Sequence, residues 1–203
     1  NLMTDDEAFL AGTTSIQAAD AEGWVVSVTP SGGWIPAFIA GETGIGLSQR
    51  MQSFVLDESL NPFNVVAPGK RPRATLTPSL ALKDGKPLMA FSVQGGDSQD
   101  QNLLQLFLNL IEFDMNVQEA VEAHNVTSYQ MPSSFGAHKS EPGRIQVTGK
   151  VSEWVRNELT KRGYKVEVVN RTYSPVTAIH FDHKTGSMWG GASDSGDDYG
   201  IAW

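Results

Sequence analysis

The stretch that decides the fold is residues 12–28, which reads Gly12-Thr13-Thr14-Ser15-Ile16-Gln17-Ala18-Ala19-Asp20-Ala21-Glu22-Gly23-Trp24-Val25-Val26-Ser27-Val28. Two short runs of strand-forming residues flank a turn that ends at a glycine, so the pattern predicts a β-hairpin. Hydroxyl residues stand directly before its first strand. If the chain is cut after Gly12, Thr13 gains a free α-amino group beside its own hydroxyl, so nucleophile and general base share one residue.

Threonine before a strand is common and indicates nothing by itself. The specific signal comes from motifs further along the chain, namely Gly41-Glu42-Thr43-Gly44-Ile45, Pro68-Gly69-Lys70-Arg71-Pro72, Thr77-Pro78, Lys83-Asp84-Gly85-Lys86 and Gln94-Gly95-Gly96. Together with Thr13-Thr14 they resemble the small subunit of the gamma-glutamyltranspeptidase family. The resemblance runs from about residue 13 to the end and includes Gly190-Gly191-Ala192-Ser193-Asp194.

The resemblance implies an N-terminal-nucleophile hydrolase with an α+β fold, the four-layer αββα sandwich. Residues 1–12 are then a lead-in segment upstream of an autocatalytic cleavage, and residues 13–203 are the catalytic domain. The family needs no cofactor. Its large subunit, made from the same precursor, is the expected partner, and a periplasmic or extracellular location follows from the resemblance alone.

Composition limits the other possibilities. The chain has 203 residues, 40% of them hydrophobic, which suits one domain with a substantial core. A net charge of −8 argues against a nucleic-acid partner. Cysteine is absent, which excludes disulfides and thiolate metal sites, and the four histidines lack metal-ligand spacing. No apolar run is long enough to span a membrane.

Local patterns place the remaining elements. A second hairpin is expected over residues 77–93, with its turn at Asp84-Gly85. Helices are expected over residues 98–113, buried on most faces, over residues 116–124 with Asn116 as N-cap, and over residues 151–162. The last of these carries an apolar stripe that includes Trp154. Strands are expected near residues 164–169, 178–181 and 188–192.

The candidate catalytic groups surround Thr13. Gly95 and Gly96 follow a strand and precede a helix, so their backbone N–H groups are candidates for an oxyanion hole, although a plain strand-to-helix turn gives the same sequence. In the family a second hydroxyl that steadies the nucleophile lies eighteen residues after it. Ser31 stands at that position, and an ordinary loop serine is the alternative.

The substrate-binding positions depart from the family. Where a Gln and an Asp before a Phe hold the glutamyl amino group, this chain has Arg50 and Ser53, and where a Ser-Ser pair holds the carboxylate it has Ala74-Thr75. A guanidinium repels an ammonium and attracts a carboxylate. The alternative is that Arg50 faces solvent.

The expected activity is therefore that of a gamma-glutamyltranspeptidase-like amide hydrolase or acyltransferase acting on a small amide or peptide, with glutathione as the type of substrate that the family implies. Two rivals remain open. One is an acylase of the same fold that takes a different amide. The other is an uncleaved, non-catalytic relative that only binds ligands.

Overall fold

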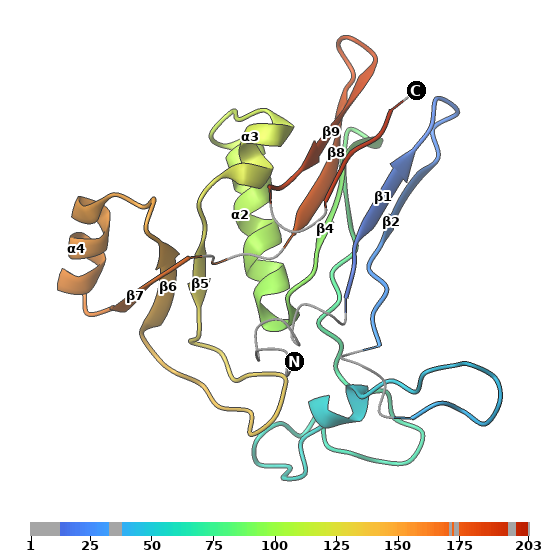
Figure 1. Ribbon diagram of the computed structural model, residues 1–203, viewed down its shortest axis with the longest axis vertical. Coiled ribbons are helices and arrows are strands. Elements are labelled where there is room, and N and C mark those ends of the chain that lie inside the picture. Colours follow the sequence, from blue (N-terminus) through green and yellow to red (C-terminus); the bar gives the residue numbers. More distant parts are fainter. Residues whose placement is uncertain (1–12, 33–37, 171, 173–174, 195–197, 203) are drawn as a thin grey trace.

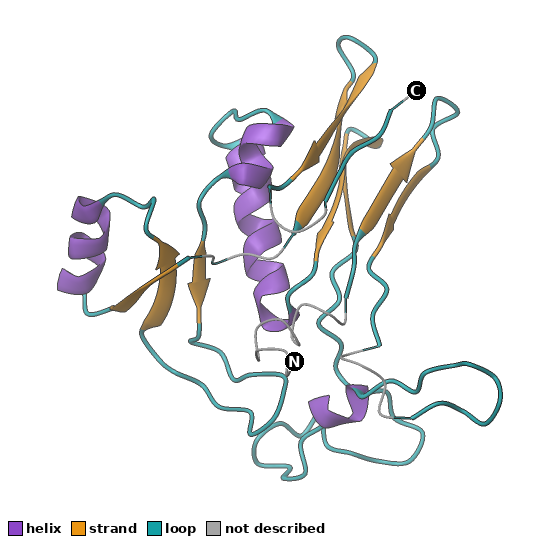
Figure 2. Cartoon of the chain, viewed as in Figure 1, coloured by secondary structure: helices purple, strands orange, loops and turns teal. Residues whose placement is uncertain are grey.

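The computed structural model describes residues 13–32, 38–170, 172, 175–194 and 198–202. The predicted lead-in, residues 1–12, lies outside them. Helices and strands are mixed along the chain, as the expected α+β class requires (Figures 1 and 2). In order, the elements are β1 (Ile16–Ala19), β2 (Val25–Val28), the short 3₁₀ helix η1 (Arg50–Ser53), β3 (Ser79–Lys83), β4 (Lys86–Val93), the 3₁₀ turn η2 (Gly96–Ser98), α2 (Gln99–Ile111), α3 (Val117–Glu122), β5 (Val126–Ser128), β6 (Arg144–Thr148), α4 (Glu153–Lys161), β7 (Lys165–Val169), β8 (Val176–Asp182) and β9 (Ser187–Ala192).

The central sheet has four antiparallel strands in the order β3-β4-β8-β9. Asp84 and Gly85 both have positive φ, 53° and 76°, which confirms the expected turn between β3 and β4. One face of the sheet packs against α2 and α3. Alternate residues of the inner strands, such as Phe91 and Val93, meet Leu103 and the other helix residues there in one hydrophobic core.

The hairpin β1–β2 packs on the opposite face of this sheet, away from α2 (Figure 1). Hydrogen bonds join the hairpin to the sheet: Gln17 donates to the fully buried Ser92, Ser15 Oγ lies 3.1 Å from Thr177 Oγ1, and the Ser27 hydroxyl donates to Phe91 O at 3.2 Å. The described residues thus supply one helical layer and two sheet layers of the expected sandwich. The outer face of the hairpin remains open.

A third sheet has the order β5-β6-β7, with β6 and β7 parallel. Sequence patterns indicate β7 but not β5, which has only three residues, or β6. The edge of β5 that does not pair with β6 is hydrogen-bonded by side chains of α2. Gln101 donates to Ser128 O and accepts from Ser128 N, and Gln105 makes the same two bonds with Val126, all at 2.8–3.0 Å.

Helix α3 begins as its sequence predicts. The Asn116 side chain accepts from the N–H of Glu119, and the Glu119 carboxylate accepts from the N–H of Asn116, which is a complete capping box. The helix lies close to β9. A Cβ at Gly191 would come within 2.9 Å of Val117 atoms, so glycine is needed for this approach.

The expected burial of the other two helices is only partly correct. Leu104 and Ile111 of α2 are exposed, because only one face of this helix meets the sheet. On α4, Trp154 is 72% exposed. Both apolar surfaces lie where no other described element covers them. Among the described residues, no helix combines the length and apolar character needed to cross a bilayer.

Candidate active site

Thr13 and Ser31 are neighbours in the structure. They form an isolated antiparallel bridge, continued by a hydrogen bond from Thr14 N to Pro30 O at 3.2 Å. Because paired residues of antiparallel strands project to the same side, their hydroxyls meet, with Thr13 Oγ1 2.9 Å from Ser31 Oγ. The two strands of the hairpin therefore bring together the predicted nucleophile and the predicted second hydroxyl.

Arg50 joins this pair from η1. A hydrogen bond from Gln49 N to Gly32 O, 3.1 Å long, ties the start of the helix to the Ser31 segment. The Arg50 guanidinium donates through Nη2 to Ser31 Oγ at 2.9 Å and through Nη1 to Thr75 Oγ1 at 3.3 Å. Arg50 thus faces the candidate nucleophile rather than solvent alone.

The charge of Arg50 is not neutralised by any described acidic residue. Among the described residues no carboxylate forms an ion pair with it. Burial lowers the pKa of its guanidinium from the ordinary value, and arginine nevertheless remains protonated in proteins. The site therefore presents a partly desolvated positive charge whose partners are hydroxyl groups.

The two remaining predicted substrate residues are both buried. Thr75 reaches Arg50 directly, as described above, and is 7% exposed. Ser53 lies one turn after Arg50, and its carbonyl accepts a hydrogen bond from Asn64 Nδ2 at 2.5 Å. The Ser53 hydroxyl is buried without a partner among the described residues. Ser53 is thus close to Arg50 in the chain but is not joined to the cluster of Thr13, Ser31 and Arg50.

Gly95 and Gly96 lie at the same end of the molecule as Thr13. Ser92 of β4 pairs with Thr177 of β8, and Thr177 contacts Ser15, so the end of β4 meets the start of β1. Both glycines have positive φ, 130° and 56°, which other residues rarely adopt. They precede α2, where backbone N–H groups lack intrahelical partners. The geometry is compatible with the predicted oxyanion hole, which stays a prediction.

Sequence reasoning missed the residues that hold the neighbouring loops. Asp97 follows the two glycines and accepts hydrogen bonds from Ser134 N at 2.7 Å and from the Ser133 hydroxyl at 3.3 Å. The ring of His138 bonds to Ser133 O and to Phe54 O, just after η1. No residue spacing in the sequence predicts these contacts. Within the described ranges, no group of histidine and acidic side chains could hold a metal ion.

Comparisons with known proteins agree with the fold and with the motifs. A family model described as gamma-glutamyltranspeptidase matches residues 4–202. The chain is 32% identical over 165 residues to the glutathione hydrolase-like YwrD proenzyme of Bacillus subtilis, covering 79% of this chain and 30% of that protein. It is 30% identical over 192 residues to the acylase ACY 1 proenzyme of Pseudomonas sp. strain SE83, covering 95% and 32%.

A solved structure gives the same result for the fold. The gamma-glutamyltranspeptidase from Pseudomonas nitroreducens complexed with L-DON matches with a TM-score of 0.78 at 22% identity, over 94% of this chain and 100% of that chain. The described layers are therefore those of this N-terminal-nucleophile hydrolase fold. The chain spans about a third of the length of the two curated relatives it matches.

Proposed function

Because the chain belongs to the gamma-glutamyltranspeptidase family, we propose that it is the catalytic portion of an amide hydrolase or acyltransferase whose nucleophile is Thr13. The observation that carries this proposal is the contact of 2.9 Å between Thr13 Oγ1 and Ser31 Oγ, at the position from which cleavage after Gly12 would free the Thr13 amine. No cofactor takes part in the reaction.

The first step is self-cleavage of the precursor. Thr13 Oγ1 attacks the carbonyl carbon of Gly12, the C–N bond breaks, and the hydroxyl proton passes to the Thr13 nitrogen. Water then hydrolyses the resulting ester, leaving a carboxylate on Gly12 and a free amine on Thr13. That amine has a typical pKa of about 7.7–8.0, so a useful fraction is neutral near pH 7 and can act as the base.

Turnover follows the same chemistry on an external amide. Thr13 Oγ1 attacks the substrate carbonyl as its proton moves to the α-amino group, and the N–H groups of Gly95 and Gly96 stabilise the oxyanion. The amine product leaves with that proton. Water or a second amine then attacks the acyl ester and restores the threonine. Ser31 holds the nucleophile throughout.

The acyl group is where this chain departs from a glutathione hydrolase. Arg50, paired only with hydroxyls among the described residues, favours an acyl group that carries a carboxylate or another acceptor over one that carries an ammonium. Of the two relatives named above, one is called an acylase. We therefore place the substrate among amides of acceptor-bearing acyl groups, with γ-glutamyl amides as the second candidate.

The partner in this proposal is a large subunit from the same precursor. Both curated relatives are named proenzymes, and about two thirds of their length lies outside the match. The outer face of β1–β2 supplies a surface for such a partner, since Ile16, Val26 and Val28 are all 42–54% exposed there. Exposed apolar side chains gathered on one face are typical of a surface that binds another protein segment.

The experiment is incubation of the purified full-length precursor at neutral pH, followed by N-terminal sequencing and intact mass of its fragments. A new terminus at Thr13 is expected, and Thr13→Ala should abolish it while Thr13→Ser retains it. Folded precursor that still carries residues 1–12 would contradict the catalytic proposal and favour the non-catalytic binding relative. The processed protein would then be assayed on paired γ-glutamyl and glutaryl anilides.

A further inference from the structure

The hydrogen bond between Arg50 and Ser31 has a fixed direction. A guanidinium can only donate, so Ser31 Oγ accepts the bond from Arg50 Nη2 at 2.9 Å. Thr13 Oγ1 lies 2.9 Å from Ser31 Oγ, and either hydroxyl can donate in this bond. Once Thr13 Oγ1 gives up its proton it can only accept, so Ser31 becomes the donor. Arg50, Ser31 and Thr13 thereby form a chain of two hydrogen bonds that ends on the proposed nucleophile.

Such a chain changes the hydroxyl next to the nucleophile. Accepting a hydrogen bond from a cation polarises the Ser31 hydroxyl and makes it a stronger donor. A stronger donor stabilises negative charge that develops on Thr13 Oγ1 when its proton leaves. Partial burial of Arg50 and the lack of an ion-paired carboxylate among the described residues leave its charge less screened than at a solvated surface.

We propose that Arg50 is a positioning residue for the nucleophile: acting through Ser31, it promotes deprotonation of Thr13 Oγ1 in both self-cleavage and turnover. The inference rests on the proposed role of Thr13 and goes beyond substrate selection, because self-cleavage takes place without any substrate in the acyl pocket. Arg50 also keeps guanidinium N–H groups beyond the two bonded ones, and these can bind an acyl group.

Self-cleavage therefore tests the proposal without interference from binding. The first-order rate of cleavage after Gly12 is measured by intact mass for the full-length precursor and for Arg50→Met, Arg50→Lys and Ser31→Ala. Arg50→Met should slow cleavage by about tenfold, as expected when one charge-assisted hydrogen bond is lost. Arg50→Lys, which keeps the charge and a donor, should restore most of the rate.

A double-mutant cycle identifies the route. If Arg50 acts through Ser31, adding Arg50→Met to Ser31→Ala should change the rate less than twofold, although each single variant is slow. Full additivity of the two effects would overturn the proposal. Arg162→Met is the matched control, because within the described ranges its guanidinium forms only an exposed pair with Glu158. Its cleavage rate should equal that of the wild type.

Folding is checked by thermal melts of each uncleaved precursor. If Arg50→Met does not fold, Arg50→Lys and Arg50→Gln give the same comparison, and cleavage at least fivefold faster for lysine supports the relay while equal rates overturn it. Wild-type precursor that is folded yet never cleaved at Thr13 would refute the proposed function itself. Normal cleavage in every Arg50 variant would refute only the role of Arg50.

Discussion

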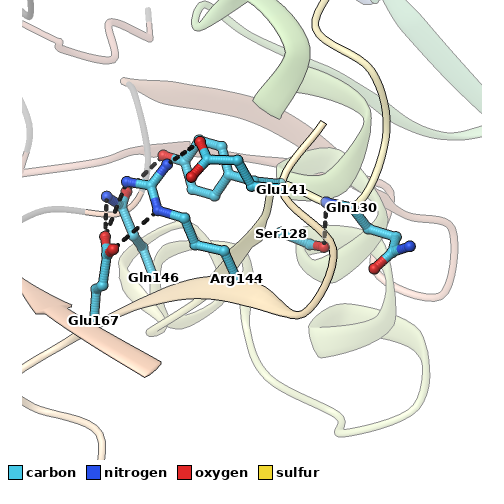
Figure 3. Close-up of polar contacts among 7 residues, drawn as sticks. Ser128, Gln130, Glu141, Arg144, Gln146 and Glu167 are labelled. Carbon is cyan, nitrogen blue, oxygen red and sulfur yellow. Dashed lines mark hydrogen bonds and ion pairs between the residues drawn. The ribbon is translucent and has the colours of Figure 1, made fainter. Parts of the chain in front are cut away.

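Arg50 and Arg144 lie in different regions of the molecule and have opposite surroundings. Arg144, at the start of β6, forms ion pairs with Glu141 at 2.8 Å and Glu167 at 2.9 Å (Figure 3). Its guanidinium also stacks on the ring of Tyr129. These partners raise the pKa of its guanidinium, whereas burial lowers that of Arg50. Glutamates of the described chain neutralise the charge of Arg144. Arg50 lies beside the proposed nucleophile, and no described carboxylate neutralises its charge.

A similar contrast holds between the strand edges that α2 and α3 contact and the hairpin beside Arg50. The β5 edge of the β5-β6-β7 sheet is closed by glutamines of α2, and β9 is closed likewise by Gln118 of α3, which bonds to both the carbonyl and the N–H of Ala192. The hairpin that carries Thr13 keeps its outer face apolar and open. Among the described residues, side chains hydrogen-bond to the strand edges at β5 and β9, whereas no described element covers the outer face of the hairpin.

The largest effect is expected from a charge on the open face. Val26→Asp should abolish assembly with the rest of the precursor, because the carboxylate would be buried without a partner. Val168→Asp is the matched control, since Val168 is also a half-exposed strand valine, at 52% against 45%, but lies on β7, away from the hairpin. Size-exclusion chromatography of co-expressed fragments measures assembly. Equal loss in both variants would show that the two regions do not differ in this way.

Removal of the glutamine contacts should give the next largest effect, on stability. Gln101→Leu with Gln105→Leu leaves two N–H and two C=O groups of β5 without their partners, and we expect a loss of about 3 kcal/mol in the free energy of unfolding. Gln105→Glu keeps the acceptor and removes only the donor, so its loss should be smaller. Urea unfolding of the assembled protein gives both values. A double variant as stable as the wild type would show that the two glutamines do not stabilise the edge of β5.

A change in substrate specificity is expected from substitution of Arg50 but not of Arg144. Arg50→Gln with Ser53→Asp removes the cation and adds an acidic group, so the ratio of kcat/KM for a γ-glutamyl anilide over a glutaryl anilide should rise about tenfold. Absolute kcat should fall for both substrates if Arg50 also acts on Thr13. Arg144→Gln should leave the ratio unchanged. A ratio that stays constant in the double variant would count against an acyl pocket at Arg50.

The sequence predicts the two regions unequally. Motifs locate the hairpins, the capping box at Asn116 and the pairing of Thr13 with Ser31, because each depends on turn chemistry or on a spacing shared with the family. The contact between Arg50 and Ser31 has no such signal, since it arises from a backbone bond between Gln49 and Gly32 in an irregular loop. The sequence does not predict strands β5 and β6 for a related reason: side chains of α2, distant in the sequence, stabilise the edge of β5.

The smallest effect concerns the ion pairs of Arg144 and their dependence on pH. The Arg144 hydrogen bonds hold the pKa of the Glu167 carboxyl below its usual value. A carboxyl whose pKa is lower in the folded state stabilises the fold above the unfolded pKa of about 4.3 and loses that contribution as the pH falls through the folded value.

Arg144→Met should therefore lower the free energy of unfolding only slightly at pH 7, because both glutamates are about half exposed, and the difference from wild type should shrink as the pH falls below about 4.3. Arg162→Met, at the exposed pair with Glu158, should cost less at every pH. Thermal melts across this range measure both. A difference that stays constant with pH would mean that Arg144 stabilises the sheet through its stacking on Tyr129 and not through Glu167, and the ion-paired carboxylates would then not account for the contrast with Arg50.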